Sequence, residues 1–449
     1  MKILRLIILI YFFSLPLTSS CQNWQGLGGG INGIRCMFTD ITNNMLYIGG
    51  SYNPSYPLSG FLGWNGTNWD TLINKNPWGN IDPILCVNKF NEEIYIGGFV
   101  YLKKWNGSSW IVIENNPNGL ISNLCVINNE LYVGGIFDSI CGIAANCIAK
   151  WDGNTWTSLN FPLSNSPSIG SICEYKGELY VGGNFYSSAY PNDTIQNIIR
   201  FDGYNWKSVG GGLHGGMDEI GSMVIYKNEL YVSGSFTKAH GNVGNYIQKW
   251  DGENWSDVGG GVMGYGGIGN GQIRQLIVYN DKLYAVGVFQ YAGGVPAQYI
   301  ALWDGAKWCG LGSTFSNILN SLGVYNNMLY VGGGFGVIDG LAISHIAKWT
   351  GGSYVDTCGN ATGITEMMVK NNNVVIYPNP SNGNSINIKF PFVKSGDYEV
   401  LDVLGAVVAK GKITNTDIIE INLNTLSNGC YFVKVKGKDK FYVGRFVKN

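Results

Sequence analysis

The sequence predicts an all-β protein, a seven-bladed β-propeller followed by a small immunoglobulin-like β-sandwich. Two short motifs, Leu-Tyr-Val-Gly-Gly and Trp-Asp-Gly-x-x-Trp or close variants, alternate strictly along most of the chain. The first begins at Leu46, Ile94, Leu131, Leu179, Leu230, Leu283 and Leu329, and the second at Trp64, Trp105, Trp151, Phe201, Trp250, Trp303 and Trp349. The composition agrees, because 65 glycines and 13% aromatic residues suit many strands joined by tight turns around an apolar core.

Each repeat reads as four short strands. In the fifth repeat, residues 223–226 and 230–234 are apolar strands around a turn, and residues 246–250 are a third strand. An Asp-Gly turn at Asp251 leads into a fourth strand at Trp255, since glycine accepts the positive φ of such turns. The second motif recurs every 41 to 53 residues, which is the period of a propeller blade. One blade cannot bury both faces, so the blades are expected to stack around an axis.

A partial copy of the repeat precedes the first complete one. Residues 23–30 match residues 254–261, the fourth-strand segment of the fifth repeat. This lone strand could join the last repeat, whose own fourth-strand segment at residues 353–355 is weak. That pairing would close the ring.

Two sets of repeated residues are predicted to be structural. Of the fourteen tryptophans, thirteen stand at repeat positions, which predicts packing between blades, and Trp78 in an inter-blade loop is the exception. The motif aspartates are Asp152, Asp202, Asp251 and Asp304, and other repeats have Asn65, Asn106 and Thr350 in their place. Asp and Asn are interchangeable at the start of a turn but not as a general base, so these residues are predicted to form turns.

Composition argues against several functions. Charged residues make up 13% of the chain and the net charge is −1, which provides no basic face for nucleic acid or a membrane surface. The three histidines fall in different repeats, and no paired-histidine spacing or calcium-loop motif occurs. The sequence therefore predicts no metal, no cofactor and no catalytic residues.

The first twenty residues have the features of a signal peptide. Lys2 and Arg5 precede a short apolar run at residues 6–13, and small residues follow at residues 18–20. Cys21 allows an alternative, a lipidated N-terminus, although Thr18 stands where that signal prefers leucine. No other segment is long and apolar enough to span a membrane.

The ten cysteines fall into groups. Cys36, Cys86, Cys125 and Cys173 are assigned to one first-strand position in consecutive repeats, where later repeats have Val, Ile or Gly, so buried free thiols are expected. Cys141 and Cys147 bracket a loop of the third repeat and could form a disulfide that staples it. Cys21, Cys309 and Cys358 remain unassigned.

Propeller geometry predicts which face binds a ligand. The first–second and third–fourth turns share one face and are uniformly tight, whereas the second–third and inter-blade connections share the other and are long and different in each repeat. Irregular loops on a rigid scaffold are where binding surfaces arise. The predicted ligand-binding residues on this loop face are Tyr52, Tyr56, Trp78, Tyr101, Tyr186, Tyr190, His214, Tyr265 and Tyr291. These side chains suit saccharide stacking or a protein interface, and the alternative is that they only cover the blade ends.

The repeats resemble the secreted propellers of fungal cortical cell-polarity marker proteins and, more loosely, kelch propellers. The resemblance covers roughly residues 23–357 and implies a surface-displayed binding or scaffold role. The chain lacks the regular kelch pattern, so kelch functions are not carried over.

The tail resembles the C-terminal sorting domain of type IX secretion cargo from Bacteroidetes-type bacteria. The residues that carry this resemblance are Tyr377, Pro378, Asn379, Pro380, Gly383, Gly405, Gly429, Tyr431 and Arg445. The resemblance implies Sec export, passage through an outer-membrane translocon by way of the type IX machinery, and release or surface attachment. Seven short strands in under 80 residues of the same region predict an immunoglobulin-like sandwich independently.

The predicted organisation is a signal peptide at 1–20, the propeller at 21–358, a linker at 359–373 and the sorting domain at 374–449. The function expected from these features is that of a secreted or cell-surface, non-catalytic module that binds a glycan or a protein, or serves adhesion. The alternative is a polysaccharide-directed enzyme that uses the loop face.

Overall fold

The computed structural model divides into two compact units, Met1–Thr362 and Gly363–Asn449, which are described separately. It describes residues 24–28, 32–51, 60–70, 83–113, 116–163, 167–187, 195–239, 242–243, 245–264, 271–351, 375–378, 381, 383–389, 395–402, 406–414, 416, 418–436 and 441–448. The predicted signal peptide and linker lie outside these residues. Every regular element within them is a β-strand, which confirms the all-β class.

The described part of the first unit contains seven antiparallel sheets with four strands in line, one for each sequence repeat. Blades one to four are β2 (Asn32–Asp40), β3 (Met45–Ser51), β4 (Phe61–Trp64), β5 (Trp69–Asp70); β6 (Ile84–Phe90), β7 (Glu93–Gly98), β8 (Tyr101–Trp105), β9 (Trp110–Val112); β10 (Leu120–Ile127), β11 (Glu130–Ile136), β14 (Ile148–Trp151), β15 (Trp156–Ser158); and β16 (Ser168–Tyr175), β17 (Glu178–Ser187), β18 (Ile195–Phe201), β19 (Trp206–Ser208). Blades five to seven are β20 (Leu213–Tyr226), β21 (Glu229–Ala239), β23 (Ile247–Trp250), β24 (Trp255–Asp257); β26 (Gln272–Tyr279), β27 (Lys282–Val288), β30 (Ile300–Trp303), β31 (Trp308–Gly310); and β32 (Leu319–Tyr325), β33 (Met328–Gly333), β36 (Ile346–Trp349), β1 (Trp24–Gly26).

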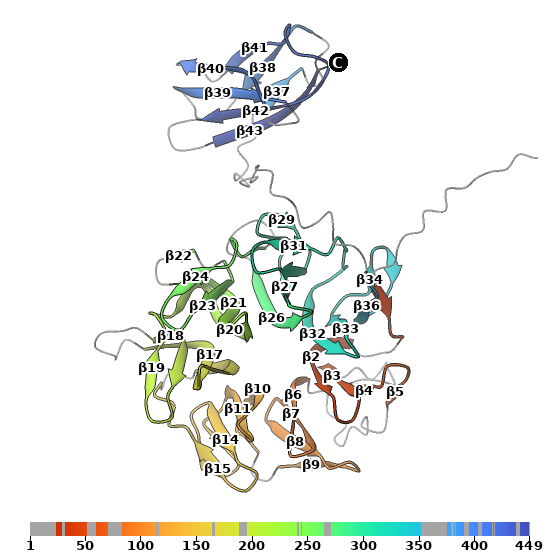
Figure 1. Cartoon of the computed structure of the whole chain (residues 1–449), viewed down its shortest axis with the longest axis vertical. Helices are drawn as coiled ribbons and strands as arrows, with labels where there is room; N and C mark the ends of the chain where they lie inside the picture. The colour runs from red at the N-terminus through yellow and green to blue at the C-terminus, as the bar shows by residue number, and fades with distance from the viewer. Residues whose placement is uncertain are drawn as a thin grey trace, which may run out of the picture. The chain divides into compact units, whose positions relative to one another are not determined.

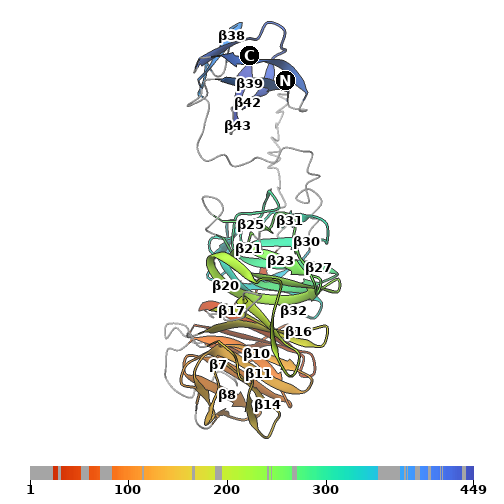
Figure 2. The same ribbon diagram turned by 90° about the vertical axis from the view of Figure 1, so that its left-hand side faces the viewer.

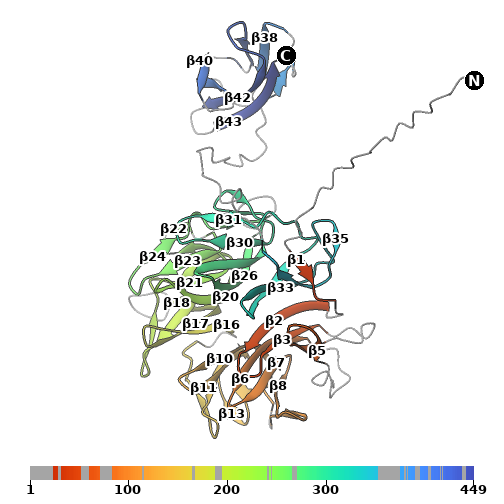
Figure 3. The ribbon, with the colours of Figure 1, turned by 45° about the vertical axis from the view of Figure 1, so that its right-hand side comes forward.

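The seven sheets stand around a common axis (Figure 1). The first strand of each blade is innermost, and these strands contact one another in the closed cycle β2, β6, β10, β16, β20, β26, β32 and back to β2. Figures 2 and 3 show the same sheets from the side, stacked face to face. Apolar clusters between neighbouring sheets fill the space that a single blade leaves exposed.

The N-terminal strand β1 supplies the outer strand of the last blade. It pairs antiparallel with β36, with Trp24 opposite Trp349. Trp24 donates from Nε1 to Ser313 Oγ of blade six at 3.0 Å, and Trp69 of blade one donates to the carbonyl of Gly28 at 2.9 Å. The fourth-strand tryptophans of blades five and six bond to their preceding blades in the same way, so β1 takes the repeat's regular place. The predicted ring closure is confirmed.

The thirteen repeat tryptophans are structural, as predicted. Each blade has one aromatic pair across its third and fourth strands, with ring centroids 4.8 to 5.4 Å apart. None of the thirteen is exposed. The motif acids are also structural, since the Asp251 carboxylate accepts the backbone N–H groups of Glu253 and Asn254, both at 2.7 Å. Asn65 makes the equivalent bonds, which explains why Asp and Asn are interchangeable there.

Polar side chains on the innermost strands bond each blade to the next. Ser171 Oγ accepts the N–H of Met223 at 3.1 Å, and Ser222 Oγ accepts that of Leu276 at 3.0 Å. Further members of this ring are Asn123, whose amide donates to Gly170 O, and Gln275, which accepts the N–H of Leu322. These bonds satisfy backbone groups that the inter-blade packing would otherwise bury without partners.

The prediction that four cysteines share one position of the first strand is wrong. They occupy two positions that lie two residues apart. Cys36 and Cys86 lie opposite Gly49 and Gly97, at the position of the bonding serines. Cys125 and Cys173 lie two residues later in the register, opposite the motif tyrosines Tyr132 and Tyr180. A two-residue step keeps the side chain on the same face of the strand, so both positions carry a half-buried or buried thiol. The prediction that all four are free thiols is confirmed.

Four of the second-to-third-strand connections form one repeated hairpin. They contain β12 (Ser139–Ile140) with β13 (Ile143–Ala144), β22 (Asn242–Val243) with the end of β21, β28 (Tyr291–Ala292) with β29 (Val295–Pro296), and β34 (Val337–Ile338) with β35 (Leu341–Ala342). A further short strand, β25 (Val262–Met263), pairs with β28. The expectation that these loops differ in every repeat is therefore wrong for these four.

Each hairpin begins at a buried phenylalanine and ends at a residue with positive φ. The phenylalanines are Phe137, Phe236, Phe289 and Phe335. Their backbone carbonyls accept hydrogen bonds of 2.8 to 2.9 Å from the backbone N–H groups of, in the same order, Cys147, Tyr246, Tyr299 and His345. The φ values of those partners lie between 63° and 71°. Backbone geometry therefore explains the placement of His345 and Cys147, with no ligand required.

The predicted bridge between Cys141 and Cys147 does not form, because both thiols are free. Cys141 sits in the hairpin turn with φ of 51° and packs against the cluster shared with blade two. Cys147 is buried on the side of blade four, where its Sγ lies 2.9 Å from Pro167 O. The two side chains thus pack in different clusters, on opposite sides of blade three. Cys309 is disulfide-bonded to a cysteine outside the described side chains.

The second unit is a β-sandwich. One sheet contains β37 (Val375–Tyr377), β38 (Ser385–Lys389) and β41 (Ile418–Asn422). The other contains β40 (Val407–Thr414), β39 (Ser395–Leu401), β42 (Gly429–Lys436) and β43 (Phe441–Lys448). Alternate residues of both sheets, including Ile386, Val433 and Phe446, form a single core, which confirms the predicted sandwich.

Candidate ligand-binding groove

Of the nine predicted ligand-binding residues, five lie outside the described residues, namely Tyr52, Tyr56, Trp78, Tyr190 and Tyr265. Tyr101 is described and does not fit the prediction, because it is buried and its hydroxyl donates to Pro83 O at 3.1 Å. Its ring lies where a side chain on Gly98 would be, so Tyr101 completes the second–third connection of blade two.

The other three described residues lie on strand extensions in three different blades. Tyr186 is 56% exposed on β17, opposite Gln196. His214 is half-buried on β20 and pairs with Lys238, and Tyr291 is half-buried on β28. Residues 213–219 belong to β20, whereas the sequence pattern places them in one of the long inter-blade connections. A common binding surface for these residues remains a prediction.

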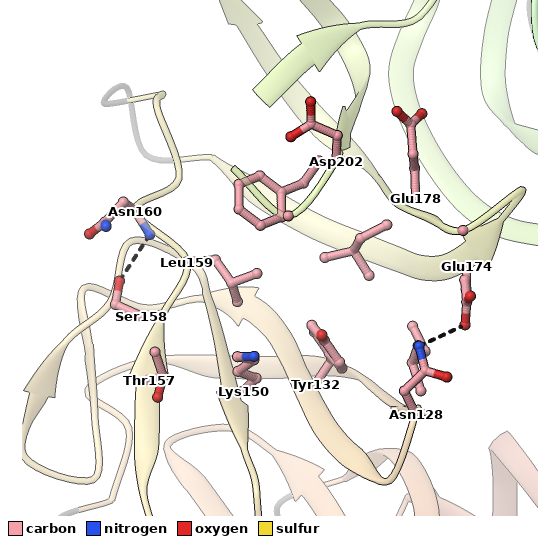
Figure 4. Close-up of a pocket in the computed structure, with 15 residues that line it drawn as sticks. Asn128, Tyr132, Lys150, Thr157, Ser158, Leu159, Asn160, Glu174, Glu178 and Asp202 are labelled. Carbon is pink, nitrogen blue, oxygen red and sulfur yellow. Dashed lines mark hydrogen bonds between the residues drawn. The ribbon is translucent and has the colours of Figure 1, made fainter. Parts of the chain in front are cut away.

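A groove of about 360 Å³ separates blades three and four. Blade three contributes Asn128, Tyr132, Lys150 and the segment 157–160, and blade four contributes Glu174, Gly177–Leu179 and Phe201–Gly203. Lys150 and Thr157 lie across the opening from Glu178 and Asp202 (Figure 4). Its rim includes first–second and third–fourth turns, so the groove reaches the tight-turn side of the ring. None of the nine predicted residues lines it.

The groove combines apolar and polar groups. Phe201 and Tyr132 provide aromatic surface, and Leu159 and Leu179 lie beneath. Asn128 crosses between the blades and donates to Glu174 Oε2 at 3.4 Å (Figure 4). An aromatic floor with amides, hydroxyls and carboxylates around it suits a polar ligand that has an apolar face.

Ion pairs fix the charged groups of the groove. Lys150 bonds to Glu130 at 2.8 Å, and Arg200 bonds to Glu178 at 2.8 Å. The Lys207 ammonium lies 2.6 Å from the Asp202 carboxylate, and together with the backbone N–H groups of Asn205 and Tyr204 it holds the pKa of Asp202 well below its usual range. Asp202 is therefore held as an anion, and the ion pair with Arg200 fixes the position of the Glu178 carboxylate.

One feature of the sequence could have indicated this groove. Glu174 is the only acid at its position of the innermost strand, where the other repeats have Thr39, Lys89, Val126, Ile225, Val278 and Val324. A residue that breaks a repeat at a solvent-accessible position indicates a local role. Among the described residues, no group of three or more His, Cys, Asp or Glu side chains is placed to hold a metal ion.

The structure describes six of the nine predicted sorting-motif residues. Tyr377 ends β37 and is exposed, whereas Tyr431 is buried, stacks on Phe446 at 5.4 Å and donates to Ser427 O at 2.7 Å. Pro378, Gly383 and Gly429 are described, and Arg445 lies on β43 opposite Phe432. Asn379, Pro380 and Gly405 lie outside the described residues.

The fold and the tail together define an exported all-β propeller protein. Residues 375–449 match the family described as secretion system C-terminal sorting domain, the sorting signal of type IX secretion. A chain with this tail is handled by the type IX machinery and is secreted or displayed on the cell surface. In the described part of the chain, no helix has the length and apolar character needed to cross a membrane.

Several solved structures match this chain at low sequence identity. The extracellular domain of a putative one-component system from B. thetaiotaomicron is 11% identical, with 95% of this chain and 59% of that chain covered and a TM-score of 0.47. A putative gluconolactonase is 9% identical over 73% of this chain and 91% of its own, with a TM-score of 0.35. A CNH domain, AfRom2, is 8% identical over 74% of this chain and 100% of its own, with a TM-score of 0.38. No curated protein matches the chain in sequence.

Proposed function

We propose that the exported propeller is a non-catalytic binding module that takes a saccharide in the groove between blades three and four. The observation that carries this proposal is the lining of the groove, where Phe201 and Tyr132 lie among Asn128, Asn160 and Thr157. Sugar rings present an apolar face and a hydroxyl edge, which matches that combination.

The state of the carboxylates supports binding over catalysis. Glycoside hydrolysis needs two carboxyl groups, one of which must hold a proton at neutral pH. Asp202 is held ionised by Lys207, so it does not suit the role of general acid, and the Glu178 carboxylate is already engaged by Arg200. In a binding module, the same fixed carboxylates serve as acceptors for sugar hydroxyls.

A glycan array probed with the full-length protein tests the proposal, followed by titration of the best ligand. Thr157→Arg should weaken binding at least tenfold, about 1.4 kcal/mol, because the exposed Thr157 points into the groove. The repeat supplies a matched control, since Ser256 holds the same fourth-strand position in blade five. Ser256→Arg should leave affinity unchanged.

Three results would overturn this proposal. If both arginine variants bind equally well, the groove is not the site, and the loop face with Tyr186 becomes the better candidate. If the array ligand is hydrolysed during incubation, the module is an enzyme. Loss of binding in both variants with normal unfolding curves would also count against the groove.

A further inference from the structure

Each innermost strand carries a β-bulge at the same place. The register with the second strand shifts by one residue there, and the extra residues are Arg35, Leu85, Ser122, Gly170, Gly221, Arg274 and Asn320. The bulges lie on the half of each blade where the inter-blade connections enter the ring, and in β20 the strand extends further on the N-terminal side of its bulge. Bulges of this kind re-aim a side chain and occur often beside functional sites.

The bulge side chains run along the inner rim toward the next blade. Ser122 donates to Ile169 O of blade four, and Asn320 donates to Ile34 O of blade one at 2.8 Å. A Cβ placed on Gly170 would lie 2.2 Å from Ile220 O of blade five. The seven residues therefore form one continuous belt around the axis, and their chemistry determines what the rim can hold.

Two arginines dominate one arc of this belt. Arg274 of blade six donates from Nη1 to Asn320 Oδ1 of blade seven and from Nε to Gln272 Oε1 at 3.2 Å. Asn320 in turn bonds to the residue that precedes Arg35 of blade one. The three side chains thus come from consecutive blades across the closure of the ring, and Arg35 is exposed.

Neither arginine has a salt bridge among the described residues. The charge of Glu219 of blade five acts on Arg274, but the two residues form no ion pair. Burial and the positive charge of Arg35 lower the pKa of Arg274. Two guanidinium groups that repel each other at a partly buried place are stabilised when an anion binds between them.

We propose that Arg35, Arg274 and Asn320 form an oxyanion-binding site on the inner rim, which takes a carboxylate, sulfate or phosphate group of a ligand. The guanidinium groups supply paired N–H donors, and the Asn320 bonds to both neighbours hold the arc in place. The site stands apart from the groove between blades three and four, and it opens on the face where the sequence predicts ligand binding.

The test is a titration of the full-length protein with sodium sulfate, sodium phosphate and sodium glucuronate, at ionic strength matched with sodium chloride. Thermal unfolding and isothermal calorimetry should both show saturable binding of at least one anion, and glucose at the same concentration should have no effect. Arg35→Gln should weaken that binding at least tenfold, and Arg274→Lys should weaken it as well, because lysine lacks the planar fork.

Lys282→Gln is the matched control, because it removes one positive charge from the same blade at the first–second turn. It should leave anion binding unchanged. The proposal is overturned if no anion gives a saturable signal, or if Arg35→Gln and Lys282→Gln behave alike. If Arg274→Lys fails to fold, Arg35→Gln alone decides, since the Arg35 side chain is exposed and its replacement leaves no buried cavity.

Discussion

Trp24→Ala should open the ring, and the structure provides the magnitude. Trp24 is 1% exposed and packs edge-on against Trp349 at 4.8 Å and Phe315 at 5.6 Å. Its truncation leaves a cavity that costs about 3 to 5 kcal/mol. The buried Ser313 hydroxyl also loses its partner, which adds about 1 kcal/mol. A total of about 4 to 6 kcal/mol is a large share of the stability of a typical domain.

Equilibrium unfolding in urea measures this loss, and hydrogen exchange shows its location. Because β1 is only three residues long, losing Trp24 should release it from β36 and speed amide exchange over residues 346–349. Trp255→Ala is the control, since Trp255 holds the same position in blade five but lies within a continuous blade. The reasoning is refuted if Trp24→Ala costs less than about 1 kcal/mol or leaves exchange in β36 unchanged.

Three further predictions follow from single contacts. Burial raises the pKa of Cys36 to about 12 and of Cys125 to about 11, so these thiols should not react with Ellman's reagent at pH 8.5 until the protein is denatured. Because their folded pKa values are raised, the unfolding free energy should be undiminished below about pH 8.5 and fall as pH rises toward 11, and a Cys36→Ala variant should show a shallower fall. Asn197→Ala should cost about 2 to 3 kcal/mol in urea unfolding, because the buried amide bonds Phe185 N at 3.1 Å and Leu213 O at 2.6 Å; a cost like that of an exposed Asn would contradict this. Tyr325→Phe should cost about 1 kcal/mol, because its hydroxyl bonds Asn44 O at 2.9 Å across the closure, and no measurable change would show that bond to be dispensable.

The repeat made the fold predictable. Tryptophan pairs, Asx turns and glycines recur at fixed spacing, and each repeated residue does the same physical job in every blade. The closing strand was also visible, because residues 23–30 copy a fourth strand. The register of the innermost strands was harder to predict. Cys36 and Cys125 lie at strand positions two residues apart, and a two-residue shift keeps a side chain on the same face of the strand, so an apolar pattern cannot detect it.

The candidate sites were less predictable. Tyr101 was placed on the surface because it follows a loop, yet it fills space that Gly98 leaves empty. The groove depends on which residues of blades three and four meet across a gap, and residues 46 positions apart such as Asn128 and Glu174 show no local pattern. The site formed by Arg35, Arg274 and Asn320 could not be predicted from the sequence. Arg35 and Arg274 lie in the first and sixth repeats, so their proximity depends both on the bulges and on closure of the ring.

Closure of the ring by the N-terminal strand is the claim on which the blade positions and the rim site depend. Gln25 and Lys348 are direct partners across β1 and β36, and antiparallel partners lie within disulfide range. We predict that Gln25→Cys with Lys348→Cys forms a cross-link that peptide mass spectrometry detects in the folded protein. Gln25→Cys with Lys249→Cys, the same third-strand position in blade five, should not form one. Free thiols at 25 and 348, or equal cross-linking in both pairs, would contradict the account.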